Sequence, residues 1–138
     1  MLIIEITGKA PRRRCEDIVS WFCRTYLPKH KLYITVNHRG LLREGVFGWC
    51  TVMDCNYRPR AFEIELHSRL NVEDYCKVLL HELQHVLQKV RRDLRHKYQK
   101  RLWKGIDCSE LDYSQQPWEI EAEQAEERLY LEYLTDNQ

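Results

Sequence analysis

The feature that most constrains the fold of this chain is the segment from Asn71 to about Arg92. Asn71 is a favourable N-cap, and Asp74 three residues later stands at the acidic position of a capping box. The apolar residues that follow recur at helical spacing and share one broad face: Cys76, Leu79, Leu80, Leu83, Val86, Leu87 and Val90. The segment therefore predicts a long amphipathic helix whose apolar face packs on other elements.

Two histidines, His81 and His85, lie on this predicted helix, roughly opposite its apolar face. Residues four apart are neighbours on a helix surface, so both imidazoles can bind one metal ion. The adjacent Glu82 can reach a water molecule at that ion without being a ligand itself. Because two neutral imidazoles suit Zn²⁺, the pattern His81-Glu82-Leu83-Gln84-His85 predicts a zinc site with Glu82 as general base.

A catalytic zinc site needs a third protein ligand and one open position. Glu119 is the favoured candidate, because it lies near the start of a predicted helix from Pro117 to about Leu134, at the edge of its apolar stripe. His96 and Glu121 are the alternatives, although the basic neighbours of His96 disfavour a dication. One turn after Glu119, Glu123 is a candidate to orient a metal-bound histidine from outside the ligand set.

Two tyrosines are further candidates for the predicted site. Tyr113 and Tyr98 are candidates for stabilising negative charge on a substrate oxygen, against the alternative that each simply packs on its neighbours.

The six cysteines include no Cys-x-x-Cys pair, so we expect reduced thiols rather than a thiolate zinc cage.

The remaining pattern predicts one α+β domain over residues 1–138. Alternating residues predict strands, and Pro11 and Pro28 bound a predicted helix between the first two of them. We expect a small, twisted, mostly antiparallel sheet on the motif helix, flanked by N- and C-terminal helices. The segment 95–112 is expected to be irregular or hairpin-like, with a turn at Gly105. The four predicted strands are Leu2–Thr7, Lys31–Asn37, Val46–Asp54 and Ala61–His67.

Charge is distributed unevenly along the chain. Residues 89–104 contain eight Lys/Arg and one Asp, whereas residues 107–138 contain ten Asp/Glu and one Arg. The two segments either face each other or are solvated separately; the alternative is a nucleic-acid contact through residues 89–104. No segment reads as a membrane span or a signal peptide, so we expect a cytoplasmic protein with no membrane partner.

The motif His81-Glu82-Leu83-Gln84-His85 and the later Glu119-Ile120-Glu121-Ala122 resemble those of gluzincin-type zincin metallopeptidases. The chain also resembles minimal gluzincins, ImmA/IrrE-like peptidases and small metallopeptidase-like proteins of bacteriophages, which would place it in a host cytoplasm. The resemblance implies a zincin-like fold and a zinc peptidase that acts on proteins or peptides. It also implies a sheet-edge strand that pairs with substrate, for which Ala61–Leu66 is the candidate.

Two alternatives to this function remain open at the level of sequence. One is a zincin-fold binding or regulatory protein without turnover. The other is a peptidase similar to the SprT type, which acts on DNA-associated proteins and takes a histidine as its third ligand; His96 would be that ligand here.

Overall fold

The computed structural model describes residues 1–138 and shows an α+β chain with two sheets. The prediction of the α+β class is therefore confirmed. The helices are α1 (Arg12–Tyr26), α2 (Val72–Val90) and α3 (Pro117–Asp136), with short 3₁₀ turns η1 (Leu42–Glu44) and η2 (Tyr113–Gln115). The strands are β1 (Leu2–Thr7), β2 (Leu32–Arg39), β3 (Gly48–Val52), β4 (Ala61–His67), β5 (Leu94–Lys97), β6 (Lys100–Trp103) and β7 (Ile106–Asp107).

The larger sheet has the strand order β1-β2-β4-β3 and is mixed. β1 pairs with β2 in parallel, β2 pairs with β4 in parallel, and only β3 and β4 are antiparallel. The expectation of a mostly antiparallel sheet was therefore wrong. The crossover through α1 makes β1 and β2 parallel, and β4, which follows the antiparallel strand β3, pairs with β2 in parallel.

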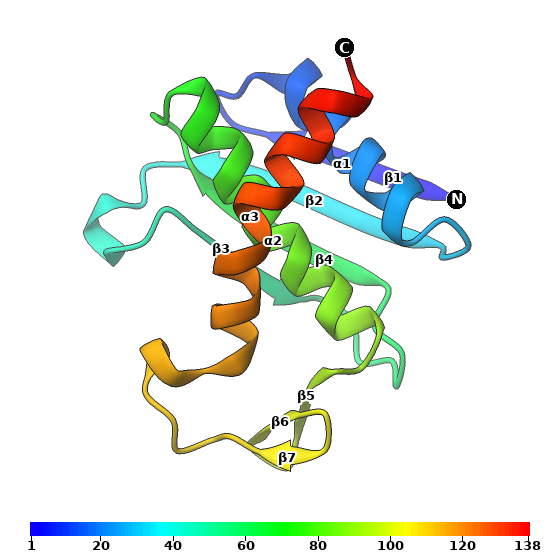
Figure 1. Ribbon diagram of the computed structural model, residues 1–138, viewed down its shortest axis with the longest axis vertical. Helices are drawn as coiled ribbons and strands as arrows, with labels where there is room; N and C mark the ends of the chain where they lie inside the picture. Colours follow the sequence, from blue (N-terminus) through cyan, green and yellow to red (C-terminus); the bar gives the residue numbers. More distant parts are fainter.

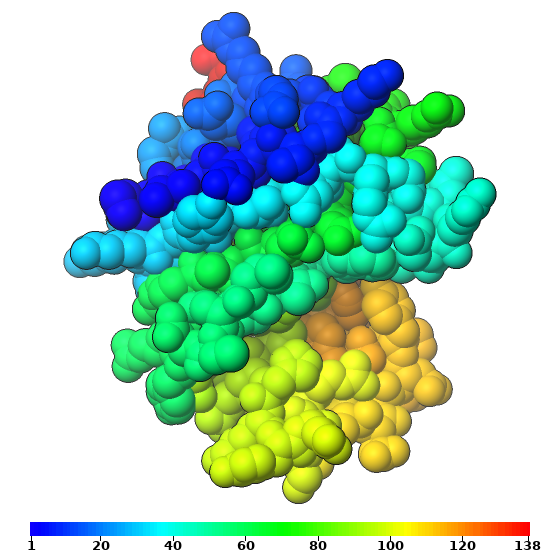
Figure 2. Space-filling model, turned by 180° about the vertical axis from the view of Figure 1, so that it is seen from behind, coloured from blue at the N-terminus to red at the C-terminus, as the bar shows by residue number.

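The two helices α1 and α2 pack beside each other on one face of this sheet, and α3 packs across α2 (Figure 1). The opposite face carries no helix, and its strands form the surface seen in Figure 2. Accordingly, β1 alternates between half-buried and exposed residues along its length.

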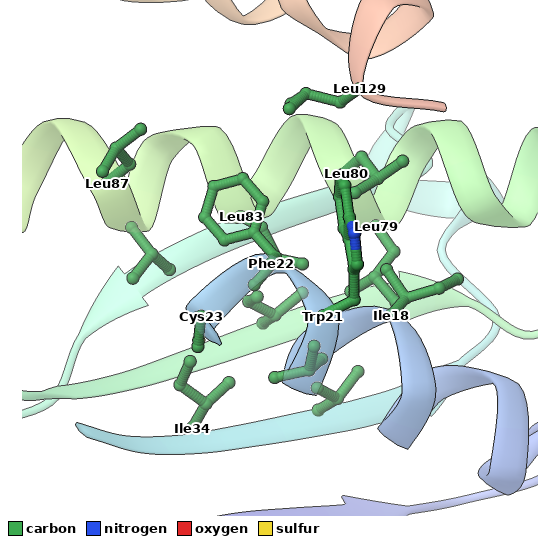
Figure 3. Close-up of a cluster of buried hydrophobic side chains, with 14 of the residues drawn as sticks. Ile18, Trp21, Phe22, Cys23, Ile34, Leu79, Leu80, Leu83, Leu87 and Leu129 are labelled. Atoms are coloured by element: carbon green, nitrogen blue, oxygen red, sulfur yellow. The ribbon is translucent and has the colours of Figure 1, made fainter. Parts of the chain in front are cut away.

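The main core lies between the larger sheet and the helices. It contains 24 buried residues, among them Phe22 of α1, Ile34 of β2 and Leu79 of α2, each 0% exposed (Figure 3). All seven apolar residues predicted to share one face of α2 are buried, which confirms that face. This packing fixes the rotation of α2 and so decides which way its histidines point.

The smaller sheet has the order β5-β6-β7 and is antiparallel throughout. It occupies the segment expected to be irregular or hairpin-like, and Gly105 makes the β6–β7 turn with φ 85°. Its own core is a cluster of three buried residues, Leu94, Cys108 and Trp118. This region lies below the larger sheet in Figure 1 and is connected to the rest of the chain through the end of α2 and the start of α3.

Both helices that carry the candidate site begin where the sequence indicated. The Asn71 side chain accepts a hydrogen bond from the backbone N–H of Asp74 at 2.9 Å, which caps α2. Pro117 occupies the first position of α3, where its missing N–H costs no helical hydrogen bond. No helix in the chain combines the length and the apolar character needed to cross a membrane.

Candidate metal centre

Three side chains from two helices meet where α2 faces the start of α3. The Oε1 atom of Glu119 lies 2.7 Å from Nε2 of His85 and 3.3 Å from Nε2 of His81. The potential ligand atoms of the three residues all lie within 4.8 Å of one another. Of the third-ligand candidates in the sequence, Glu119 is the one that the fold brings to both histidines.

The position of Glu119 follows from how α3 begins. Trp118 is buried in the small core, which anchors the first turn of α3 beside the end of α2. The Nε2 of Gln88, on α2, donates to the Trp118 carbonyl at 2.9 Å and fixes the two helices relative to each other. Glu119, one residue on, is therefore directed at α2 and is only 7% exposed.

The other imidazole nitrogen of each histidine is held by a separate acceptor. The Nδ1 of His81 lies 2.8 Å from Oε2 of Glu126, and the Nδ1 of His85 lies 2.8 Å from Oε1 of Gln88. The sequence predicted Glu123 in this orienting role, but the structure places Glu126 there. Glu123, about one turn earlier on α3, is exposed and lines the hollow beside His81 without a hydrogen bond to either histidine.

Glu121 also has a place outside the ligand set. Its Oε1 accepts hydrogen bonds from Gln84 at 2.9 Å and from Gln88 at 3.0 Å. The amide nitrogen of Gln88 thus serves two acceptors, Glu121 and the Trp118 carbonyl, and its amide oxygen must face His85. Gln88 was not singled out in the sequence; its position three residues after His85 on the helix is the only signal that could have indicated it.

These partners assign the proton positions of both rings. A carboxylate and an amide oxygen only accept, so His81 and His85 each donate through Nδ1. In the neutral rings both Nε2 atoms then direct lone pairs toward the Glu119 carboxylate, which itself only accepts. Such a convergence of three acceptors needs a proton or a metal cation among them. Two imidazoles and a carboxylate, with their outer nitrogens held in this way, fit Zn²⁺.

The same hydrogen bonds shift the pKa values of His81 and Glu119. Burial lowers the pKa of His81, but the hydrogen bonds with Glu119 and Glu126 outweigh it and raise this pKa to about 10. Burial raises the pKa of Glu119, but the hydrogen bonds from His81 and His85 hold it well below its ordinary value. The cluster therefore favours an added positive charge between the imidazoles and the carboxylate.

Glu82 lies next to the triad without joining it. It is 5% exposed, and burial raises its pKa above the ordinary range of a glutamate. A buried carboxylate with a raised pKa is suited to accept and return a proton near neutral pH. Tyr113, in η2, is 62% exposed, and burial of its hydroxyl with the nearby charge of Glu119 raises its pKa.

Two adjoining hollows open beside Glu82. The basic hollow, of about 240 Å³, contains Lys89, His96 and Arg101 in its wall together with Glu82, His85 and Glu119. The acidic hollow, of about 780 Å³, contains Glu123 and Glu126 together with His81 and Glu82. Tyr113 and Gly48 line both. Seen from behind, the surface has a hollow between β3 and the smaller sheet, and the start of α3, coloured orange, is visible inside this hollow (Figure 2).

The strand that borders these hollows is β3, since Gly48 lines both of them and Cys50 lines the basic hollow. The predicted edge strand, Ala61–Leu66, is instead β4, which lies inside the sheet between β2 and β3. That prediction was wrong because β4 inserts between β2 and β3 and leaves β3 at the edge of the sheet. The Cys50 carbonyl points away from β4 and accepts a hydrogen bond from Nζ of Lys89 at 3.2 Å.

Several basic side chains of residues 89–104 pack against other parts of the protein. Lys89 is buried, the Arg92 guanidinium stacks on Tyr57 at 3.5 Å, and the Arg101 guanidinium lies 5.4 Å from the Trp118 ring. His96 lines the basic hollow but does not belong to the metal cluster. No ion pair joins this segment to residues 107–138, so the two charged segments do not neutralise each other.

The six cysteines are all free thiols, and no second group of histidine, cysteine, aspartate or glutamate side chains assembles elsewhere in the chain. The triad is thus the one place where the fold gathers metal-ligating groups. Comparison with protein-family models, with curated proteins and with solved structures gave no match. The functional conclusion therefore rests on the geometry of the site.

Proposed function

We propose that this protein is a zinc-dependent peptidase. The observation that carries the proposal is the meeting of His81, His85 and Glu119, with their outer partners in place and Glu82 beside them. These three residues would hold a zinc ion, which when bound would supply a water molecule with a pKa of about 7 and a Lewis acid for the peptide carbonyl.

Glu82 performs the proton transfers of this reaction. Its carboxylate takes a proton from the attacking water as the carbon–oxygen bond forms, and delivers it to the amide nitrogen as the carbon–nitrogen bond breaks. Burial raises the pKa of Glu82, which makes its carboxylate a stronger proton acceptor. Tyr113 borders both hollows, and in this proposal its hydroxyl donates a hydrogen bond to the substrate oxygen.

The substrate in this proposal is an extended peptide that lies along β3. In an antiparallel pair, alternate residues direct their backbone groups away from the partner strand, and the outward Cys50 carbonyl shows that Gly48 and Cys50 are these residues. A peptide can add main-chain hydrogen bonds at Gly48. A side chain on Gly48 would come within 3.0 Å of Val78, so glycine lets the strand approach α2 closely.

Metal content and turnover test the proposal separately. Purified protein should hold one zinc per chain, and His85→Ala or Glu119→Ala should lose it. Glu82→Gln should keep the zinc and lower peptide hydrolysis about 10²- to 10⁴-fold. Glu127→Gln, at an exposed position on α3, is the matched control and should change neither quantity. Folded protein that stays metal-free in excess zinc would overturn the proposal.

A further inference from the structure

The basic hollow has two chemically different sides. The metal ligands and Glu82 form one side, whereas the other carries Lys89 from the last turn of α2 and the pair His96 and Arg101 from the smaller sheet. His96 and Arg101 are directly opposed on β5 and β6. Three basic side chains from three elements therefore converge on the space next to the proposed reaction centre.

The protein leaves these charges without a carboxylate partner. Lys89 is 9% exposed, yet its ammonium has one hydrogen bond, to the Cys50 carbonyl, and no ion pair. The Arg101 guanidinium donates to the Ser109 carbonyl at 3.2 Å and also makes no ion pair. Glu82 and Glu119 are the carboxylates that line the same hollow, and neither forms an ion pair with Lys89 or Arg101.

An unpaired buried charge is costly, and acidic residues to neutralise it are at hand. Residues 107–138 contain ten of them, and Asp107 lies on the strand next to Arg101. Asp107 instead accepts hydrogen bonds from Ser109, at 2.5 Å from its hydroxyl and 3.0 Å from its N–H. The guanidinium of Arg101 thus remains available on the hollow side, stacked on Trp118.

We propose that the basic hollow is a carboxylate-binding subsite, formed by Arg101 and Lys89, that selects peptides with a carboxylate close to the scissile bond. A guanidinium presents two parallel N–H groups that match the two carboxylate oxygens. The carboxylate comes from an Asp or Glu side chain or from a free C-terminus. The inference rests on the proposed peptidase function, because it names the substrate class of that same site.

Peptide binding to zinc-loaded Glu82→Gln protein, measured by calorimetry, tests the subsite. One pair of probes is acetyl-Ala-Ala-Glu-Ala-Ala-amide and its Gln counterpart; the other is acetyl-Ala-Ala-Ala with a free or an amidated C-terminus. In at least one pair, the carboxylate member should bind about tenfold tighter or more. A preference in the first pair identifies a side-chain carboxylate, and one in the second identifies a C-terminus.

Substitutions then assign the preference to the hollow. Adding Arg101→Gln or Lys89→Met should remove most of it, whereas Lys100→Gln, an exposed residue on the same strand as Arg101, should not. Arg101→Lys keeps the positive charge but lacks the two parallel N–H groups of the guanidinium, so it should retain an intermediate preference for the carboxylate peptide. A preference in neither pair, or one that survives both Arg101→Gln and Lys89→Met, overturns the proposal.

Digestion of a peptide library by the zinc-loaded wild type separates this inference from the proposed function. Cleavage concentrated next to Asp, Glu or free C-termini supports both. Cleavage with no such preference overturns the subsite and leaves the peptidase. Carboxylate binding that depends on Arg101, together with absence of cleavage, overturns the peptidase and supports the subsite as a ligand-binding site.

Discussion

The two sheets of this protein differ in how much buried structure supports them. The larger sheet and its helices enclose a core of 24 buried residues, whereas the smaller sheet rests on Leu94, Cys108 and Trp118. The histidines belong to the first region, and Arg101 and His96 to the second. The proposed metal ligands need fixed positions, and the two histidines lie on the helix that packs into the larger core, whereas the side of the hollow that would border the proposed substrate has the smaller core.

Thiol labelling gives the largest expected difference between the two regions. At pH 8, iodoacetamide should modify the exposed Cys55 first, Cys108 of the small core next, and Cys15, Cys23 and Cys76 last. Burial raises the pKa of Cys23 to about 12, which leaves little thiolate there. Core thiols that react only through global unfolding should be slowed at least about a thousandfold.

Mass spectrometry of the labelled peptides over time measures this order. Cys108 should become accessible through local opening of the smaller sheet while the main core stays closed. If Cys108 reacts as slowly as Cys23, the two regions unfold as one unit and the comparison fails.

The next largest difference is expected when one leucine in each region is replaced by alanine. Leu79→Ala, in the main core, is expected to lower the free energy of unfolding by about 4 kcal/mol, and Leu94→Ala, in the small core, by about 2 kcal/mol. The reason is that fewer neighbours surround Leu94, so that its site can collapse. Urea denaturation measures both, with the exposed Leu131→Ala as control; equal losses at the two sites would contradict the prediction.

Gln88 lies where the two regions meet, since it contacts both His85 and the Trp118 carbonyl. Gln88→Leu should weaken zinc binding about 10- to 100-fold, because His85 loses the acceptor that orients its ring. Competition with a chromophoric chelator measures the affinity. Gln124→Leu, at an exposed position on α3, is the control. Unchanged zinc affinity in Gln88→Leu would show that the ring is positioned by packing alone.

The helix cap gives the smallest expected effect. Asn71→Ala removes the hydrogen bond to the Asp74 N–H and should cost about 1 kcal/mol in the free energy of unfolding. Because Asn71 belongs to the larger region, the substitution should speed labelling of Cys76 and leave that of Cys108 unchanged. An equal acceleration at both thiols would indicate one cooperative unit.

Much of the candidate site was predictable because its parts are local. Helical spacing places His81 and His85 on one face, and the apolar face of α2 is buried as its periodicity indicated. Glu119 was predicted from its place at the edge of a second helical stripe. Glu126 and Gln88 were missed, because the partner of an outer nitrogen depends on how two helices cross, which spacing along one helix does not reveal.

The sequence by itself determined the helices, the Asn71 cap of α2 and the side chains that each helix presents, since these follow from interactions among residues a few positions apart. The tertiary structure alone decided that β2 joins β4 in parallel, that β3 is the edge strand, and that Lys89 and Arg101 face the same hollow. The physical reason is that strand pairing and helix crossing are selected by burial of the whole core. That free energy is shared among residues far apart in the chain.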